Sequence, residues 1–130
     1  MSFGYGVGDV LAVSKLALDV YTAYKDAPDD FRNISDEIES LHIIINRCEG
    51  KFQSKPLNSE DRVQLWRILQ GCTNVLNDLN KLYTKYMSLG SVQGSSSRAI
   101  NRIKWSQENI SELRARLTSN TTLLSAFLAR

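Results

Sequence analysis

Apolar residues recur at helical spacing in four long stretches, separated by breaks rich in proline, glycine or serine. A period of about 3.6 residues is typical of amphipathic α-helices, and no stretch alternates long enough to predict a strand. The pattern predicts helices near residues 9–25, 30–52, 58–89 and 106–130. The expected fold of residues 1–130 is one all-α domain, a four-helix bundle, because such helices bury their apolar faces against one another.

The first predicted helix is apolar around more of its circumference than a bundle helix requires. Its main stripe consists of Val10, Val13, Leu16, Ala17, Val20, Tyr21 and Tyr24. Leu11 and Leu18 form a second strip outside that face. Before the helix, glycines at 4, 6 and 8 alternate with Phe3, Tyr5 and Val7, which gives a pliable apolar start. Two interpretations stay open: these residues cover the end of the bundle, or they meet an apolar partner such as a bilayer interface.

The second and third helices are predicted to build most of the core. The second carries a heptad-like seam of Phe31, Ile34, Ile38, Leu41, Ile45, Cys48 and Phe52. The third carries three parallel apolar strips, which predicts that it is the central helix of the bundle. Gly71 in its middle costs roughly 1 kcal/mol relative to alanine, and therefore indicates a close helix crossing or a slight kink.

The last part of the chain combines a predicted loop with a basic segment. The composition of residues 90–97 predicts a loop, and residues 98–104 are expected to add one extra short helix. Ser106 is the expected N-cap of the last helix, since Trp105 and Ile110 have the spacing of a hydrophobic staple. Five basic residues form a candidate basic surface: Arg98, Arg102, Lys104, Arg114 and Arg116. Its interpretations are a solvated face, a site for anionic lipid, or a site for an acidic protein.

Charge is distributed unevenly along the chain. Residues 1–50 carry four Lys/Arg against nine Asp/Glu, and residues 51–130 carry twelve against five. The two parts therefore have charges of −5 and +7, which agree with the net charge of +2. Such a split either holds two halves of a bundle together or orients the domain toward an anionic surface. The charge is too small, and no reading element is evident, so we expect no nucleic-acid partner.

The sequence offers little that could support catalysis. His42 is the only histidine, and no cysteine or carboxylate stands at ligand spacing from it, so neither a metal nor a cofactor is expected. No nucleophile with a base and an orienting group is recognisable, so the chain is not expected to be an enzyme. The two cysteines, Cys48 and Cys72, lie in apolar helical stripes, which favours a reducing, cytoplasmic location. The opening is neither a secretory signal nor long enough to span a bilayer.

Four segments, taken together and in order, carry a resemblance to a known family. They read MSFGYGVGDVLAVSKLA, AYKDAPDDFRNISDEIESLHIII, LQGCTNVLNDLNKLYTKY and RIKWSQENISELRARLTSNTTLLSAFL. The chain resembles the N-terminal domain of fungal NLR-type receptors, which are STAND proteins with a nucleotide-binding NACHT module and ankyrin or similar repeats. More distantly, its expected architecture is similar to HeLo and HeLo-like domains, to the four-helix bundle of the necroptosis pseudokinase and to the coiled-coil domains of plant immune receptors.

The resemblance implies a function in innate immunity or incompatibility. It implies a signalling domain that triggers programmed cell death after oligomerisation, with a downstream nucleotide-binding module in the same chain. It also implies that the first helix targets membranes, with cytoplasmic protein recruited to the plasma membrane on activation. The residues that match this role are Phe3, Tyr5, Val7, Val10, Leu11 and Leu18, with the basic segment 98–104. The alternatives are a regulatory or homotypic docking bundle without membrane activity, and a passive scaffold for the downstream module.

Overall fold

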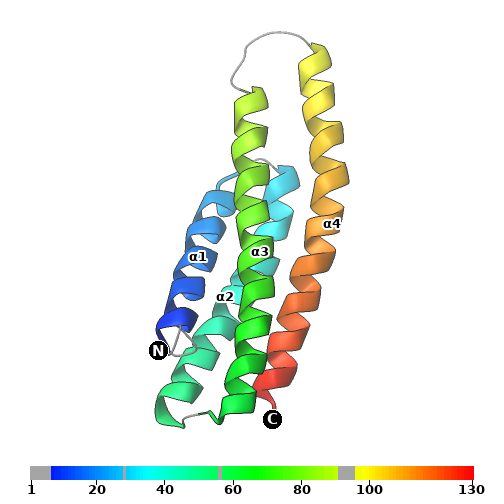
Figure 1. The fold of residues 1–130 in the computed structure, drawn as a ribbon. Coiled ribbons are helices and arrows are strands. Elements are labelled where there is room, and N and C mark those ends of the chain that lie inside the picture. Colours follow the sequence, from blue (N-terminus) through cyan, green and yellow to red (C-terminus); the bar gives the residue numbers. More distant parts are fainter. Residues whose placement is uncertain (1–6, 28, 56, 91–95) are drawn as a thin grey trace.

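The protein folds into the expected all-α four-helix bundle (Figure 1). A computed structural model describes residues 7–27, 29–55, 57–90 and 96–130, and the side chains of 9–27, 32–55, 57–87 and 109–130. No strand occurs within these ranges. The helices are α1 (Val7–Lys25), α2 (Asp29–Ser54), α3 (Ser59–Gly90) and α4 (Ser96–Leu128). The predicted helices near 9–25, 30–52 and 58–89 are confirmed to within two residues at each end.

The prediction for the last helix is wrong at its beginning. α4 begins at Ser96, so residues 98–104 belong to it and form no separate short helix. Ser106 therefore lies inside a continuous helix and is not its N-cap. The physical reason is visible in the sequence, because no proline or glycine interrupts residues 96–128. The apolar seam also continues upstream from Ile110 through Ile103 to Ala99, at helical spacing.

The helices pack as a ring in the order α1, α2, α4, α3, and the pairs α1/α4 and α2/α3 lie on its diagonals. The bundle thus consists of two hairpins, α1–α2 and α3–α4, laid side by side (Figure 1). The link between Ser54 and Ser59 joins α2 to α3, which lie diagonally opposite each other in this ring. The prediction that the third helix is central is wrong: α3 occupies a corner and packs mainly on α1 and α4. Most members of its apolar strips are buried, among them Leu65, Val75 and Leu76.

One hydrophobic core runs through all four helices. The predicted seam of α2 is confirmed at Ile34, Ile38, Leu41, Ile45 and Cys48, which are fully buried. Phe52 is partly buried, and the side chain of Phe31 lies outside the described part. Tyr24 of α1 is also fully buried, and its hydroxyl donates a hydrogen bond of 2.5 Å to the backbone carbonyl of Leu79 in α3. This bond satisfies a polar group that would otherwise be costly to bury.

The predicted close crossing at Gly71 is present between α3 and α4. A Cβ atom added at Gly71 would lie only 2.4 Å from Oδ1 of Asn120. The side-chain amide of Asn120 donates a hydrogen bond of 2.9 Å to the carbonyl of Arg116. Glycine fits here without a shift of Asn120, whose side chain occupies the space that a methyl group would need.

The helices differ in length, and this difference shapes the molecule. α1 and α2 have 19 and 26 residues, whereas α3 and α4 have 32 and 33. The end of α3 and the beginning of α4 consequently project beyond the other two helices (Figure 1). The projection lies at the opposite end of the bundle from the beginning of α1 and the end of α4.

Candidate functional site

Two leucines of α1 lie on the outside of the bundle. Leu11 and Leu18 expose 47% and 45% of their surface, although leucine is a residue that folding normally buries. They are two helical turns apart, so they share one outward strip of α1. Of the other predicted membrane residues, Val10 is only 2% exposed and belongs to the core. Val7 begins α1 but its side chain is outside the described part, and Phe3 and Tyr5 lie outside the described residues.

The inward face of α1 is made of small side chains. Besides Tyr24, its buried apolar residues are Val10, Val13, Ala17 and Val20. Leu16 is partly buried against the same core. Two of the three leucines of α1 thus face outward while valine and alanine face inward, which is the reverse of the usual distribution of apolar bulk.

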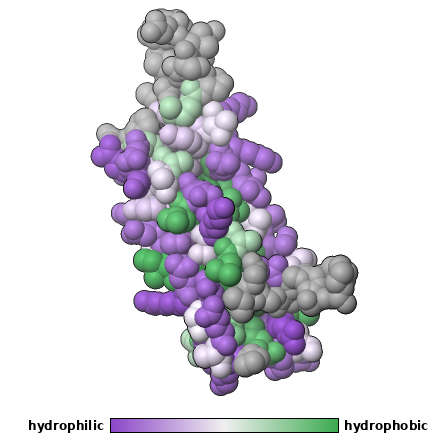
Figure 2. All heavy atoms as spheres, turned by 90° about the vertical axis from the view of Figure 1, so that its left-hand side faces the viewer, coloured by the Kyte–Doolittle hydropathy of each residue, from purple (hydrophilic) through white to green (hydrophobic). Residues whose placement is uncertain are grey.

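The outward strip does not belong to one continuous apolar surface. Figure 2 shows the side of the molecule on which α1 lies, where hydrophobic patches are separated by hydrophilic side chains. Ile43 of α2 and Leu123 of α4 are similarly exposed, at 45% and 52%. The described side chains on this face therefore offer separate small apolar contacts to a membrane or a partner.

Polar contacts fix α1 against α2 on this side. The hydroxyl of Ser14 donates a hydrogen bond of 2.5 Å to Oδ1 of Asn46, whose amide nitrogen lies 3.4 Å from Nε2 of His42. Farther along, the carboxylate of Glu39 lies beside the hydroxyl of Tyr21 and raises the pKa of that phenol. These groups hold the two helices in register. They offer no base and nucleophile arranged for catalysis.

The structure divides the predicted basic surface. The guanidinium of Arg114 pairs with Glu37 of α2, and that of Arg116 pairs with Asp78 of α3 at 2.7 Å. The second carboxylate oxygen of Glu37 is buried and has no hydrogen-bond partner in the part of the chain that the structure describes. Arg114 and Arg116 therefore join α4 to its two neighbours.

The remaining three basic residues lie elsewhere. Arg98, Arg102 and Lys104 belong to the projecting first part of α4, and their side chains lie outside the described part. The structure consequently does not bring the basic segment and the beginning of α1 together, because they occupy opposite ends of the bundle (Figure 1).

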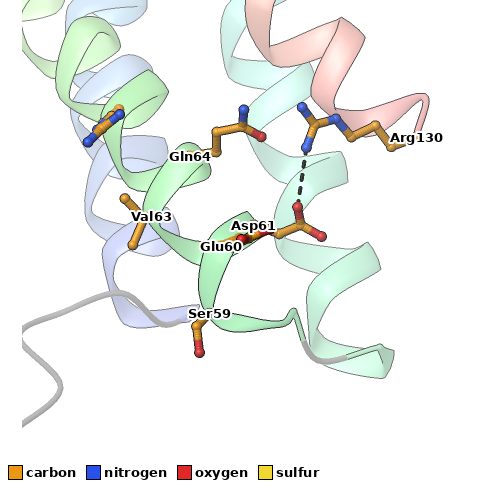
Figure 3. A pocket seen from close by; sticks show the side chains of 7 residues that line it. Ser59, Glu60, Asp61, Val63, Gln64 and Arg130 are labelled. Atoms are coloured by element: carbon orange, nitrogen blue, oxygen red, sulfur yellow. Dashed lines mark hydrogen bonds and ion pairs between the residues drawn. The ribbon is translucent and has the colours of Figure 1, made fainter.

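A different group of basic residues gathers at the lower end of Figure 1, where α2 ends, α3 begins and α4 ends. Nζ of Lys51 donates hydrogen bonds to the carbonyls of Leu128, at 2.5 Å, and Arg130, at 3.4 Å. Arg130 forms an ion pair of 3.2 Å with Asp61 and lies over the ring of Phe127, 5.1 Å from its centroid. Figure 3 shows the Arg130 side chain reaching toward Asp61 beside an open pocket of about 590 Å³ on the first turns of α3.

The pattern of the sequence does not predict this lower cluster of Lys51, Lys55 and Arg130. Lys51 and Lys55 are one turn apart near the end of a predicted helix, which is a weak signal by itself. Their approach to Arg130 depends on how α2 and α4 pack, and this is not encoded in local spacing.

Both cysteines are buried and free. Burial raises the pKa of each thiol to about 12, so at neutral pH neither forms the thiolate that nucleophilic chemistry needs. Within the described residues, no three metal-binding side chains are grouped to hold an ion, and none of the helices is long and apolar enough to cross a bilayer.

Comparisons with protein-family models, with curated proteins and with solved structures gave no match to this chain.

Proposed function

We propose that this bundle is the N-terminal effector domain of a fungal NLR-type receptor, which triggers programmed cell death by oligomerisation and membrane targeting through α1. The observation that carries the proposal is the outward position of Leu11 and Leu18 on a helix whose inward side chains are small. A surface helix with apolar groups on two sides can bind in the plane of a bilayer interface without crossing it.

The energy available from one copy is small. Burying a leucine side chain contributes about 1.5–3 kcal/mol, and both leucines are already half buried in the bundle. A single domain is therefore expected to bind a bilayer weakly. Clustering by the receptor multiplies these contacts, because each further copy binds from a high effective concentration.

Deeper insertion requires α1 to leave the core. Val10, Val13, Val20 and Tyr24 then exchange the protein interior for lipid, so their own burial changes little. The larger cost is the apolar surface of α2 and α3 that α1 covers in the bundle. Oligomerisation offsets this cost if neighbouring copies cover that surface, which links self-association to membrane insertion.

The test is the double variant Leu11→Glu plus Leu18→Glu. We expect it to keep its helical circular dichroism spectrum and to lose flotation with anionic vesicles, vesicle leakage and cell killing. The matched control is Ile43→Glu plus Leu123→Glu, which adds the same two carboxylates at similarly exposed residues of α2 and α4. The control should still bind vesicles, because it leaves α1 unchanged.

Two outcomes would contradict the proposal. Undiminished leakage and killing by the folded double variant would show that α1 does not contact the membrane. In the second outcome, the wild-type protein binds no vesicles but binds a protein partner, and the double variant no longer binds that partner. The domain is then the docking bundle, and the outward leucines are its contact surface.

A further inference from the structure

The groove at the lower end of the bundle is a cavity of about 270 Å³ formed where three helices meet. The residues that line it come from the end of α2, the link to α3, the first turn of α3 and the end of α4. They are Lys51, Phe52, Lys55, Leu57, Asn58, Asp61, Phe127 and Arg130. Apolar and charged groups both contribute, so the groove is amphipathic.

The floor of the groove is aromatic and is built by contacts between α2 and α4. The rings of Phe52 and Phe127 meet edge to face with their centroids 5.7 Å apart. Phe127 is 4% exposed and belongs to the core, while Phe52 and Leu57 are partly buried against it. The floor is therefore rigid and can receive an apolar group.

The rim of the groove is positively charged. Lys51, Lys55 and Arg130 face one carboxylate, that of Asp61. The carboxylate of Asp61 accepts one hydrogen bond from Arg130, and this uses only one of the five N–H donors of the guanidinium. Lys51 is held in place by two carbonyls of the α4 terminus. The backbone N–H of Lys55 donates to the carbonyl of Lys51 at 3.1 Å, but its ammonium group makes no hydrogen bond or ion pair with any described residue and is available to an anion.

This combination fits one kind of ligand. Several convergent ammonium and guanidinium donors bind phosphate oxygens well. The aromatic floor beside them suits an apolar body covalently attached to the phosphate. The groove also lies toward the same end of the bundle as the beginning of α1 (Figure 1).

We propose that this groove binds a phosphate group carried on an apolar body, with an anionic phospholipid as the source that fits its position. This source rests on the proposed function, because the same end of the domain then approaches the bilayer with α1. Lys55 and Arg130 contact the phosphate, and the partly buried Phe52 and Leu57 contact the adjoining apolar group.

The experiment compares Lys55→Gln with Lys81→Gln. Lys81 is exposed on α3 outside the groove, so both variants lower the net charge equally. Flotation uses phosphatidylcholine vesicles with and without phosphatidic acid. Since one basic residue near an anionic surface contributes about 1 kcal/mol, we expect Lys55→Gln to weaken binding to the phosphatidic acid vesicles about five-fold. Lys81→Gln should change it less than about two-fold.

A second arm tests whether the phosphate that the groove binds belongs to a soluble molecule. Glycerol 3-phosphate is titrated into each variant, and the amide resonances of residues around the groove are followed by NMR. Loss of a response in Lys55→Gln, without any vesicle preference in the wild type, assigns the site to a soluble organophosphate. Equal behaviour of the Lys55 and Lys81 variants in both arms overturns the proposal.

The two proposals fail separately. If the double leucine variant stops floating and Lys55→Gln floats normally, α1 contacts the membrane and the groove does not bind the lipid phosphate. If Lys55→Gln weakens binding and the leucine variant does not, the groove is the lipid contact and the role of α1 is wrong. Thermal denaturation of each variant accompanies both arms, and Lys55→Gln should not lower the melting temperature.

Discussion

α1 and α2 pack against each other, yet they distribute their apolar bulk in opposite ways. α2 buries large side chains, since Ile34, Ile38, Leu41 and Ile45 are all fully buried. α1 contributes mainly valine and alanine to the same core and exposes two leucines. A helix that keeps its largest aliphatic groups outside contributes less to the core per residue.

Because of this difference, three helices can be described as a frame and α1 as a helix attached to it. α2, α3 and α4 are linked by large buried side chains and by the ion pairs of Arg114 and Arg116. We call these three the frame helices. α1 covers one side of the frame, where it packs most extensively on α2 and also on α3.

The largest effect is expected from truncating the core of α2. Ile38→Ala should lower the free energy of unfolding by about 2–5 kcal/mol, because it leaves a cavity at a fully buried site. Val20→Ala in α1 removes one carbon fewer, with a transfer cost of about 1.6 kcal/mol plus the cost of any cavity left, and should therefore cost less than Ile38→Ala. Urea denaturation measures both. Equal losses would break the distinction between α1 and the frame helices.

An intermediate effect is expected where α3 meets α4. Gly71→Ala pushes a methyl group against Oδ1 of Asn120, and overpacking typically costs about 1–3 kcal/mol. The better helix propensity of alanine returns roughly 1 kcal/mol, so a small net loss remains.

Whether Gly71→Ala lowers or raises the free energy of unfolding depends on Asn120. In an Asn120→Ala background the obstruction is absent, and Gly71→Ala should then stabilise the protein. A double-mutant cycle by urea denaturation measures this coupling. Additive effects of the two changes would mean that the frame helices are loosely packed at this crossing.

The smallest effect at neutral pH concerns the buried thiols of the frame helices. Burial raises the pKa of Cys48 and of Cys72 to about 12, against 9.0 for an unperturbed thiol. The folded protein thus retains protons that the unfolded chain has lost between these two values. The contribution of these thiols to the free energy of unfolding should be constant well below pH 9 and fall as pH rises from about 9 toward 12.

Cys72→Ala checks the cause of this alkaline loss. Denaturation followed at several pH values should show a shallower decline in this variant than in the wild type. If the stability of the wild type and of Cys72→Ala declines equally at alkaline pH, other groups cause the decline. Tyr24 is among them, because burial also raises the pKa of its phenol.

Local pattern predicted most of the fold. The seam of α2 repeats with so little interruption that its buried residues follow from spacing alone, and the exposure of Leu11 and Leu18 follows in the same way. The beginning of α4 was misplaced because Ser106 and its staple-like neighbours imitate a helix start. The continuing seam through Ile103 and Ala99 was the stronger signal.

The candidate sites were less predictable, because they depend on how distant segments meet. Spacing along α4 shows that Arg114 and Arg116 are basic, but it does not show that Glu37 and Asp78 lie opposite them. Likewise, Lys55 and Arg130 are far apart in sequence and line one groove only after α2 and α4 have packed.

The diagonal link between α2 and α3 has a consequence for how the chain folds. Extensive contacts join helices that are adjacent or next but one along the chain, whereas the first and last helices lie on a diagonal. The contacting helices are therefore close together in the sequence, so folding closes only short loops. Topologies with such a low contact order fold fast. During synthesis, the hairpin of α1 and α2 can form once residue 54 has emerged, before either of the two long helices exists.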